Sequence, residues 1–229
     1  MQKVLSAFLA LSVLLTIPAA SLAAHGEAQA DKAGILVVSF GTSMPKARRA
    51  IDNLVNAAKT AFPDTEVRLA FTSNIIRRKI ARERNEIVPT PVEALARMND
   101  EGFTHVYVMP THIIPGEEYD EIANVVDAFR SLKGKYGFKV LALGKPYLNS
   151  TADCARMARV LTARFAAQLR NKGTGIVLMG HGTPDHFANA LYSLLQTSLD
   201  KEAYGRFFVG TVEATPEIGD VIARLRRKE

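Results

Sequence analysis

Short apolar runs alternate along the chain with longer segments in which apolar residues recur every three or four positions. One of these runs, residues 176–179, holds four apolar residues between two glycines and predicts a strand buried on both faces. Thr183-Pro184 then predicts a helix N-cap followed by proline at the first helical position, and so a helix over 184–199. His181 is therefore expected in the turn between strand and helix, at the carboxyl edge of a parallel sheet.

The same alternation continues through the rest of the chain. It predicts strands at 34–40, 67–71, 105–109, 139–143 and 207–212. It predicts helices at 45–62, 75–84, 90–102, 117–132, 151–169 and 217–227. Thr90-Pro91-Val92-Glu93 is a capping box with proline at the first helical position, which marks the start of the third of these helices. Strands and helices in this order predict an α/β fold, with a parallel sheet covered on both faces.

An internal repeat divides the chain into two halves. Residues 34–43 align with 175–184 at an offset of 141 (34 to 175), and the same offset places Phe71-Thr72 on Val212-Glu213. A repeated plan of this kind predicts two similar, doubly wound parallel-sheet domains with a cleft between them. We expect an N-terminal domain over 34–143 and a C-terminal domain over 144–229. The second half holds two of the four strands of the first, so we expect the C-terminal domain to be incomplete in this chain.

The first residues have the pattern of a secretory signal peptide. Lys3 gives a positive start, residues 4–17 are apolar, and Ser21-Leu22-Ala23 places small residues where a signal peptidase reads them. We expect a signal peptide over 1–23, with Ala28 and Ala30 as alternative cleavage sites, followed by a flexible lead-in over 24–33. A retained membrane anchor is the alternative. Cleavage predicts a periplasmic protein with no stable membrane insertion.

Composition narrows the classes of function. The chain has 229 residues, of which 48% are hydrophobic and 23% charged, with a formal net charge of +6. The basic residues are spaced along the predicted helices, so nucleic acid is not an expected partner, whereas a small polyanionic ligand suits this charge. Cys154 is the single cysteine, so no disulfide forms within the chain. The sequence holds neither a P-loop nor a GxGxxG fingerprint.

Three residues are candidates for metal chemistry. His181 and Glu213 fall at the carboxyl ends of two consecutive strands of the second half, which lie close together in a parallel sheet. An imidazole and a carboxylate there could hold a divalent transition ion and leave coordination positions open. His112, on the loop after the third strand, would face the same cleft, and either histidine could be the ligand and the other the base. The alternatives are that Glu213 accepts hydrogen bonds from the following helix and that both histidines only stabilise their turns.

Other polar residues fit less specific roles. His105 begins a strand and is expected to be structural, while His186, in the first turn of a predicted helix, could support a metal ligand. Ser39 with His181 and Asp185 would suggest a hydrolase, but Ser39 lies inside a predicted strand and lacks the nucleophile-elbow pattern.

Five segments carry a resemblance to a known family: 36–43, 70–73, 112–119, 179–182 and 209–213. In order and spacing they resemble the motifs of the anaerobic sirohydrochlorin cobalt chelatases, class II chelatases related to ferrochelatase. The resemblance implies two doubly wound domains around a tetrapyrrole cleft, with His181 and Glu213 as metal ligands. It also implies a third ligand, a histidine in an Ala-Gly-Asp-His-like loop after the next strand. No such loop follows in this sequence, so we expect a partial sequence or a shortened relative.

The resemblance predicts insertion of Co²⁺, with Fe²⁺ as a second metal, into sirohydrochlorin in cobalamin biosynthesis. Such a lyase requires no cofactor, since Co²⁺ is a substrate. His112 is then the first candidate base. Glu117 and Glu118 are further candidate bases and are expected to contact the macrocycle, and Arg77 and Arg78 are expected to bind its carboxylates. The expected partners are a tetrapyrrole and a divalent metal, and a homo-oligomer is compatible with the sequence. The alternative is an exported tetrapyrrole or metal carrier without turnover.

Overall fold

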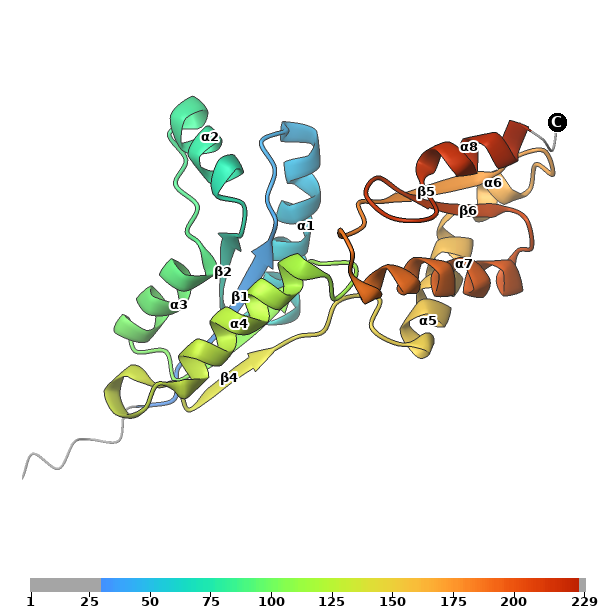
Figure 1. Ribbon diagram of the computed structural model, residues 1–229. Coiled ribbons are helices and arrows are strands. Elements are labelled where there is room, and N and C mark those ends of the chain that lie inside the picture. Colours follow the sequence, from blue (N-terminus) through green and yellow to red (C-terminus); the bar gives the residue numbers. More distant parts are fainter. Residues whose placement is uncertain (1–29, 227–229) are drawn as a thin grey trace, which may run out of the picture. The chain divides into compact units, whose positions relative to one another are not determined.

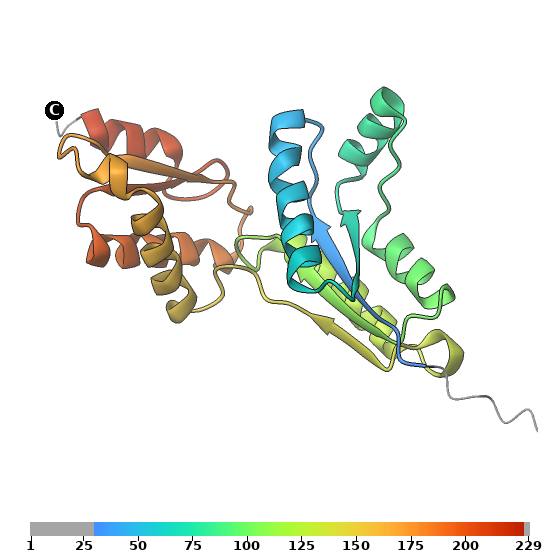
Figure 2. The same ribbon diagram turned by 180° about the vertical axis from the view of Figure 1, so that it is seen from behind.

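The computed structural model describes residues 30–226 (Figures 1 and 2). The predicted signal peptide, 1–23, and most of the predicted lead-in, 24–33, lie outside the described residues. From Asp31 onward the chain forms one compact unit. Within residues 30–226, no helix combines the length and the apolar character that crossing a membrane would require.

The first half forms a four-stranded parallel sheet with the order β2-β1-β3-β4. Its strands are β1 (Ala33–Ser39), β2 (Glu66–Phe71), β3 (His105–Pro110) and β4 (Val140–Leu143). Its helices are α1 (Pro45–Ala61), α2 (Asn74–Arg84), α3 (Pro91–Asp100) and α4 (Glu117–Ser131), and the short 3-10 helix η1 (Gly134–Tyr136) precedes β4. Each of these strands and α-helices starts and ends within two residues of its predicted bounds. The predicted α/β class with a doubly wound parallel sheet is confirmed.

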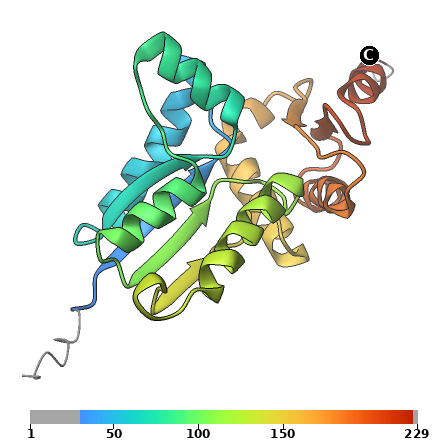
Figure 3. The same cartoon turned by 60° about the vertical axis from the view of Figure 1, so that its left-hand side comes forward.

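Alternation along β1 explains why helices cover both faces of this sheet. Leu36 and Val38 belong to the core that α3 and α4 complete, through residues such as Leu95 and Ile122. Successive side chains of a strand point to opposite faces, so the residues between them are directed toward the side of α1. Figure 3 shows α1 behind the sheet and α3 and α4 in front of it. A strand covered on both sides needs a nearly continuous apolar run, which β1 supplies.

The second half forms a separate parallel pair, β5 (Ile176–Gly180) and β6 (Phe207–Thr211). Its helices are α5 (Thr151–Arg164), α6 (Ala166–Leu169), α7 (Ala190–Glu202) and α8 (Ile218–Arg226), and the 3-10 helix η2 (Phe187–Asn189) precedes α7. The helix predicted over 151–169 is therefore interrupted, at Phe165, and continues as the short α6. The offset of 141 relates β5 to β1 and β6 to β2, and both pairs are parallel. The division into domains at 143/144 stays a prediction.

The prediction that the strand at 176–179 is buried on both faces is wrong. Val177 is 42% exposed and Met179 is 66% exposed. The core of α5 and α7 packs against the face that carries Ile176 and Leu178. On the other face α8 covers β6, where a Cβ added at Gly210 would lie 2.9 Å from Val221. Val177 and Met179 of β5 therefore stay accessible to solvent.

The helix predicted over 184–199 begins six residues later, at Ala190. Asp185 has a positive φ of 44°, which a helix cannot accommodate. His186, instead of lying in a first helical turn, is the N-cap of η2, and its side chain accepts a hydrogen bond from the Ala188 amide. The Asn189 side chain accepts from Thr183 N at 3.1 Å and donates to Thr183 O at 2.6 Å. These bonds hold residues 183–189 as a turn, and Thr183 is not a cap for the helix that follows.

The predicted capping box is confirmed and leads to a stability prediction. Glu93 N donates to Thr90 Oγ1 at 3.1 Å, and Thr90 N donates to Glu93 Oε2 at 2.7 Å. Replacing Thr90 with alanine leaves the Glu93 amide without its acceptor, so we expect the free energy of unfolding to fall by about 1 kcal/mol. Urea denaturation measures this change. Thr90→Ser keeps the hydroxyl and serves as the control; equal losses in both variants would contradict the capping role.

Candidate functional site

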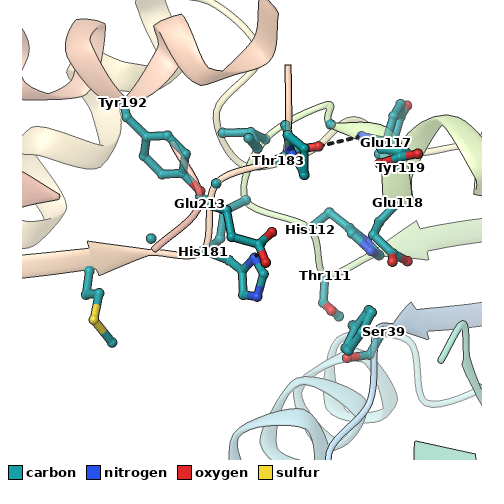
Figure 4. A pocket seen from close by; sticks show the side chains of 18 residues that line it. Ser39, Thr111, His112, Glu117, Glu118, Tyr119, His181, Thr183, Tyr192 and Glu213 are labelled. Atoms are coloured by element: carbon teal, nitrogen blue, oxygen red, sulfur yellow. Dashed lines mark hydrogen bonds and ion pairs between the residues drawn. The ribbon is translucent and has the colours of Figure 1, made fainter. Parts of the chain in front are cut away.

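A pocket lies at the carboxyl edge of the four-stranded sheet, where β1 and β3 are neighbours and the strand order reverses. The chain leaves β1 toward β2 on one side and returns to β3 on the other, and ligands of doubly wound sheets bind in the crevice outside such a point. Ser39 ends β1 there and Phe40 follows it, and Thr111 and His112 follow β3. Together with the start of α4 and the loops after β5 and β6, they line a pocket of about 600 Å³ (Figure 4).

His181 and Glu213 are brought together at one side of this pocket. The distance from His181 Nδ1 to Glu213 Oε2 is 3.4 Å, and both side chains are accessible. The backbone fixes this pairing, because the His181 carbonyl accepts hydrogen bonds from Val212 N at 3.1 Å and Glu213 N at 2.8 Å. In Figure 4 the two side chains point into the same open space. The predicted proximity at neighbouring strand ends is confirmed; the role as metal ligands stays a prediction.

His112 stands on another wall of the same pocket. Both of its ring nitrogens are buried, and neither has a hydrogen-bond partner among the described residues. Burial removes the imidazole from water and lowers the pKa of His112 below its usual 6.5. The neutral ring therefore keeps a free lone pair, which can accept a proton or bind a metal ion.

The first turn of α4 places two carboxylates at the pocket. Glu117 and Glu118 both line it, and Glu118 Oε2 accepts a hydrogen bond from Thr72 Oγ1 at 3.1 Å. Burial raises the pKa of Glu118; the charges of Glu121 and Glu117 act in the same direction, against the Thr72 hydrogen bond and His181. A carboxyl group with a raised pKa is suited to accept and release a proton.

Comparison with known proteins assigns the chain to a family. Residues 33–229 match the family described as cobalt chelatase (CbiK). The chain belongs to the cobalt chelatase family. It is 32% identical over 196 residues to the sirohydrochlorin cobaltochelatase CbiKC of Nitratidesulfovibrio vulgaris, an alignment that covers 86% of this chain and 67% of that protein. It is also 32% identical over 198 residues to the sirohydrochlorin cobaltochelatase of Salmonella typhimurium, covering 85% and 71%.

The family membership agrees with the resemblance found in the five sequence segments. Among residues 30–226, no group of three or more His, Cys, Asp and Glu side chains is arranged to hold a metal ion. The third histidine ligand implied by the resemblance is not tested by the structure. The chain thus presents the pair His181–Glu213 on one wall of its pocket and His112 and Glu118 on the walls around it.

The structure does not place the two predicted arginines at the pocket lining. The Arg77 guanidinium donates to Val88 O at 2.7 Å, to Asn74 Oδ1 at 2.9 Å and to Glu93 Oε2 at 2.6 Å. It therefore joins α2 to the segment that leads into α3. Arg78 is exposed on α2, outside the residues that line the pocket. Binding of substrate carboxylates by these arginines stays a prediction.

The surroundings of Ser39 do not favour a hydrolase, and those of His105 agree with a structural role. The Ser39 hydroxyl accepts a hydrogen bond from Gly41 N at 3.3 Å, and Ser39 is 5% exposed, which does not favour a hydrolase nucleophile. His105 lies at the amino end of β3, where its Nδ1 is 2.9 Å from Thr104 Oγ1. It is far along the strand from the carboxyl edge that forms the pocket.

Sequence reasoning missed the apolar side chains of the pocket. Phe40, Ile113 and Met179 line it and are 45%, 47% and 66% exposed. Large exposed apolar side chains around a hollow indicate a ligand with an apolar surface. The positions of two of them were a signal in the sequence. Phe40 directly follows β1, and Ile113 lies in the loop after β3. Nothing in the sequence indicated that Met179 would be uncovered.

Proposed function

We propose that this protein is a sirohydrochlorin cobaltochelatase, which inserts Co²⁺ into the free macrocycle. Family membership and the names of both relatives support the reaction. The observation that carries the proposal is the accessible His181–Glu213 pair, with 3.4 Å between Nδ1 and Oε2, in a pocket that also holds a buried neutral imidazole, His112. Such a pocket combines a place for the ion with a place for the departing protons.

The ion would bind to His181 and Glu213. Imidazole nitrogen and carboxylate oxygen are suitable donors for divalent first-row metals, and two protein ligands leave positions for water and for incoming pyrrole nitrogens. The Irving–Williams order places Fe²⁺ just below Co²⁺, so the same donors should accept Fe²⁺ with lower affinity. Co²⁺ enters as a substrate and leaves in the product, so the reaction needs no resident cofactor.

Insertion exchanges two macrocycle N–H protons for one divalent ion. Four nitrogens bind the ion, and the two protons must pass to acceptors near the ring. His112 can take the first, because its neutral ring has no competing partner among the described residues. Glu118, with its raised pKa, is a second acceptor, and Glu117 lies beside it at the start of α4.

The macrocycle would rest on the apolar side chains of the pocket. Phe40, Ile113 and Met179 offer accessible apolar surface to a flat ring. Its peripheral carboxylates would remain outside, where the formal charge of +6 attracts them. Of the two predicted arginines, Arg78 is the better candidate for these carboxylates, because Arg77 is held by three hydrogen bonds.

A turnover assay tests the proposal. The purified chain, far below the sirohydrochlorin concentration, is mixed with excess Co²⁺, and the macrocycle spectrum is followed under anaerobic conditions. We expect many equivalents of cobalt-sirohydrochlorin per protein, at a rate well above the protein-free reaction. A spectral change that stops at one equivalent would indicate a carrier instead. No acceleration and no binding would reject both functions.

A further inference from the structure

The loop that carries His181 is attached to the N-terminus of α4, which comes from the other half of the chain. Glu117 N donates to Thr183 Oγ1 at 3.3 Å, and His186 Nε2 lies 3.2 Å from Asp120 Oδ2. Each of these pairs joins residues that are 66 positions apart in the sequence. A Cβ added at Gly116 would lie 2.9 Å from Thr183 Cγ2, so the Gly116 backbone packs directly against the Thr183 side chain.

Thr183 supplies the cap that α4 lacks. The N-cap of α4 is Gly116, which has no side chain to accept a hydrogen bond from the first turn. The Thr183 hydroxyl accepts from the first amide of the helix, that of Glu117. Thr183 is 7% exposed, so water competes little for this bond. A residue that precedes α7 in the sequence therefore stabilises the start of α4.

His186 makes the second contact in a defined tautomer. Its Nδ1 accepts from Ala188 N at 3.1 Å, so the ring proton is on Nε2, which donates to Asp120 Oδ2. The His186 side chain is 17% exposed and that of Asp120 is 55% exposed. A carboxylate is a strong acceptor for this N–H, and the bond fixes the direction in which the imidazole ring points.

These contacts join the two sides of the proposed reaction site. The loop on one side begins at His181, whose carbonyl holds the Glu213 amide. The helix on the other side carries Glu118 in its first turn and directly follows the His112 loop. We infer that His186 and Asp120 are positioning residues, which set the proposed metal ligands at the correct distance from the proton acceptors. This inference rests on the proposed function.

Loss of this positioning should lower the rate of the reaction measurably. Displacing reacting groups by about 1 Å can lower a rate by about a hundredfold. Removing a hydrogen-bond partner behind a metal ligand lowers affinity or activity by about 10- to 100-fold. The Asp120–His186 bond holds the loop that carries His181 and does not touch the ligand side chain itself, so a loss near the lower value is expected.

Two substitutions at one position separate positioning from local folding. In His186→Asn the side-chain oxygen can replace Nδ1 and still accept from the Ala188 amide, but it cannot reach Asp120. In His186→Gln the side-chain amide can replace Nε2–H and donate to Asp120, but the bond from Ala188 is lost. We expect His186→Asn to lower kcat for Co²⁺ insertion about tenfold, with an unchanged melting temperature and an unchanged Kd for Co²⁺ alone. We expect His186→Gln to restore kcat to within about twofold of the wild type.

Asp120→Ala provides an independent removal of the same bond. It should reproduce the loss of His186→Asn, and the double variant should be no slower than either single variant, because one interaction is lost in each case. Amide hydrogen exchange in the first turn of α4 adds a measurement without turnover: it should be faster in His186→Asn and Asp120→Ala than in the wild type and His186→Gln.

Three outcomes would overturn the inference: a wild-type kcat in His186→Asn, equal losses in the Asn and Gln variants, or additive losses in the double variant. Failure of the proposed function has a different signature. In that case the wild type itself would not turn over, whereas failure of the inference alone leaves wild-type turnover intact.

Discussion

His181→Ala should lower kcat/KM for Co²⁺ insertion by about a thousandfold or more. A metal ligand contributes several kcal/mol, and each 1.36 kcal/mol corresponds to about a tenfold change in rate. In the variant the half-exposed carboxylate of Glu213 would be left to bind the ion in competition with water. Because the His181 side chain is 73% exposed, its removal leaves no cavity in the core, and the melting temperature should stay unchanged. Anaerobic insertion kinetics and calorimetric titration with Co²⁺ alone measure the two effects.

Glu213→Gln and His105→Gln complete this experiment. The first keeps the size of the side chain but removes its charge, so it should weaken Co²⁺ binding and insertion together. The second changes a histidine at the amino end of β3, away from the pocket, and should leave both properties unchanged. A full rate of insertion in His181→Ala would reject the assignment of the metal site.

The strands, and the edge of the sheet at which the site lies, could be predicted because they depend on local sequence patterns. A buried parallel strand needs an apolar run, and β1 shows one in which six residues are buried in succession. Once the strands are placed, parallel pairing puts all their carboxyl ends at one edge, so His181, Glu213 and His112 were expected near a common pocket. The structure lines one pocket with all three.

The start of α7 could not be predicted from the same kind of pattern. Thr183-Pro184 is a common helix start, but its hydroxyl is used by Glu117 N, which is 66 residues away. Asn189 holds the Thr183 backbone on both sides and favours a turn. A local signal was thus overridden by a contact between distant segments, and this contact belongs to the site.

The sequence also did not predict which strand residues are buried or which groups the arginine side chains contact. The apolar run of β5 did not reveal that α8 covers only β6, so Met179 was expected in the core and lies in the pocket instead. Arg77 was expected to bind substrate because it follows β2, yet its guanidinium is held by Val88, Asn74 and Glu93. The hydrogen-bond partners of a long side chain depend on how the neighbouring helices pack, and the sequence pattern does not encode this packing.

His112→Leu should lower kcat for insertion about a hundredfold while leaving the Kd for Co²⁺ alone unchanged. General-base catalysis contributes about 10²- to 10⁴-fold, and Glu118 can take part of the role. In the wild type, kcat/KM should fall as the pH drops through the pKa of His112, which burial lowers below its usual 6.5. This acidic limb should be lost or displaced in the variant. A loss of Co²⁺ affinity instead would assign His112 to the metal and not to the protons.

The same residue should make stability depend on pH with a defined sign. Because burial lowers the pKa of His112, the unfolded chain binds this proton at a higher pH than the folded protein does. Between the folded pKa and 6.5 the unfolded state holds more protons, so the free energy of unfolding falls as the pH falls. Glu118, whose pKa is raised, contributes with the opposite sign above 4.5. Denaturation at several pH values should therefore show a smaller loss below pH 6.5 in His112→Leu and a larger one in Glu118→Gln; identical slopes in all three proteins would mean that neither group is perturbed by the pocket.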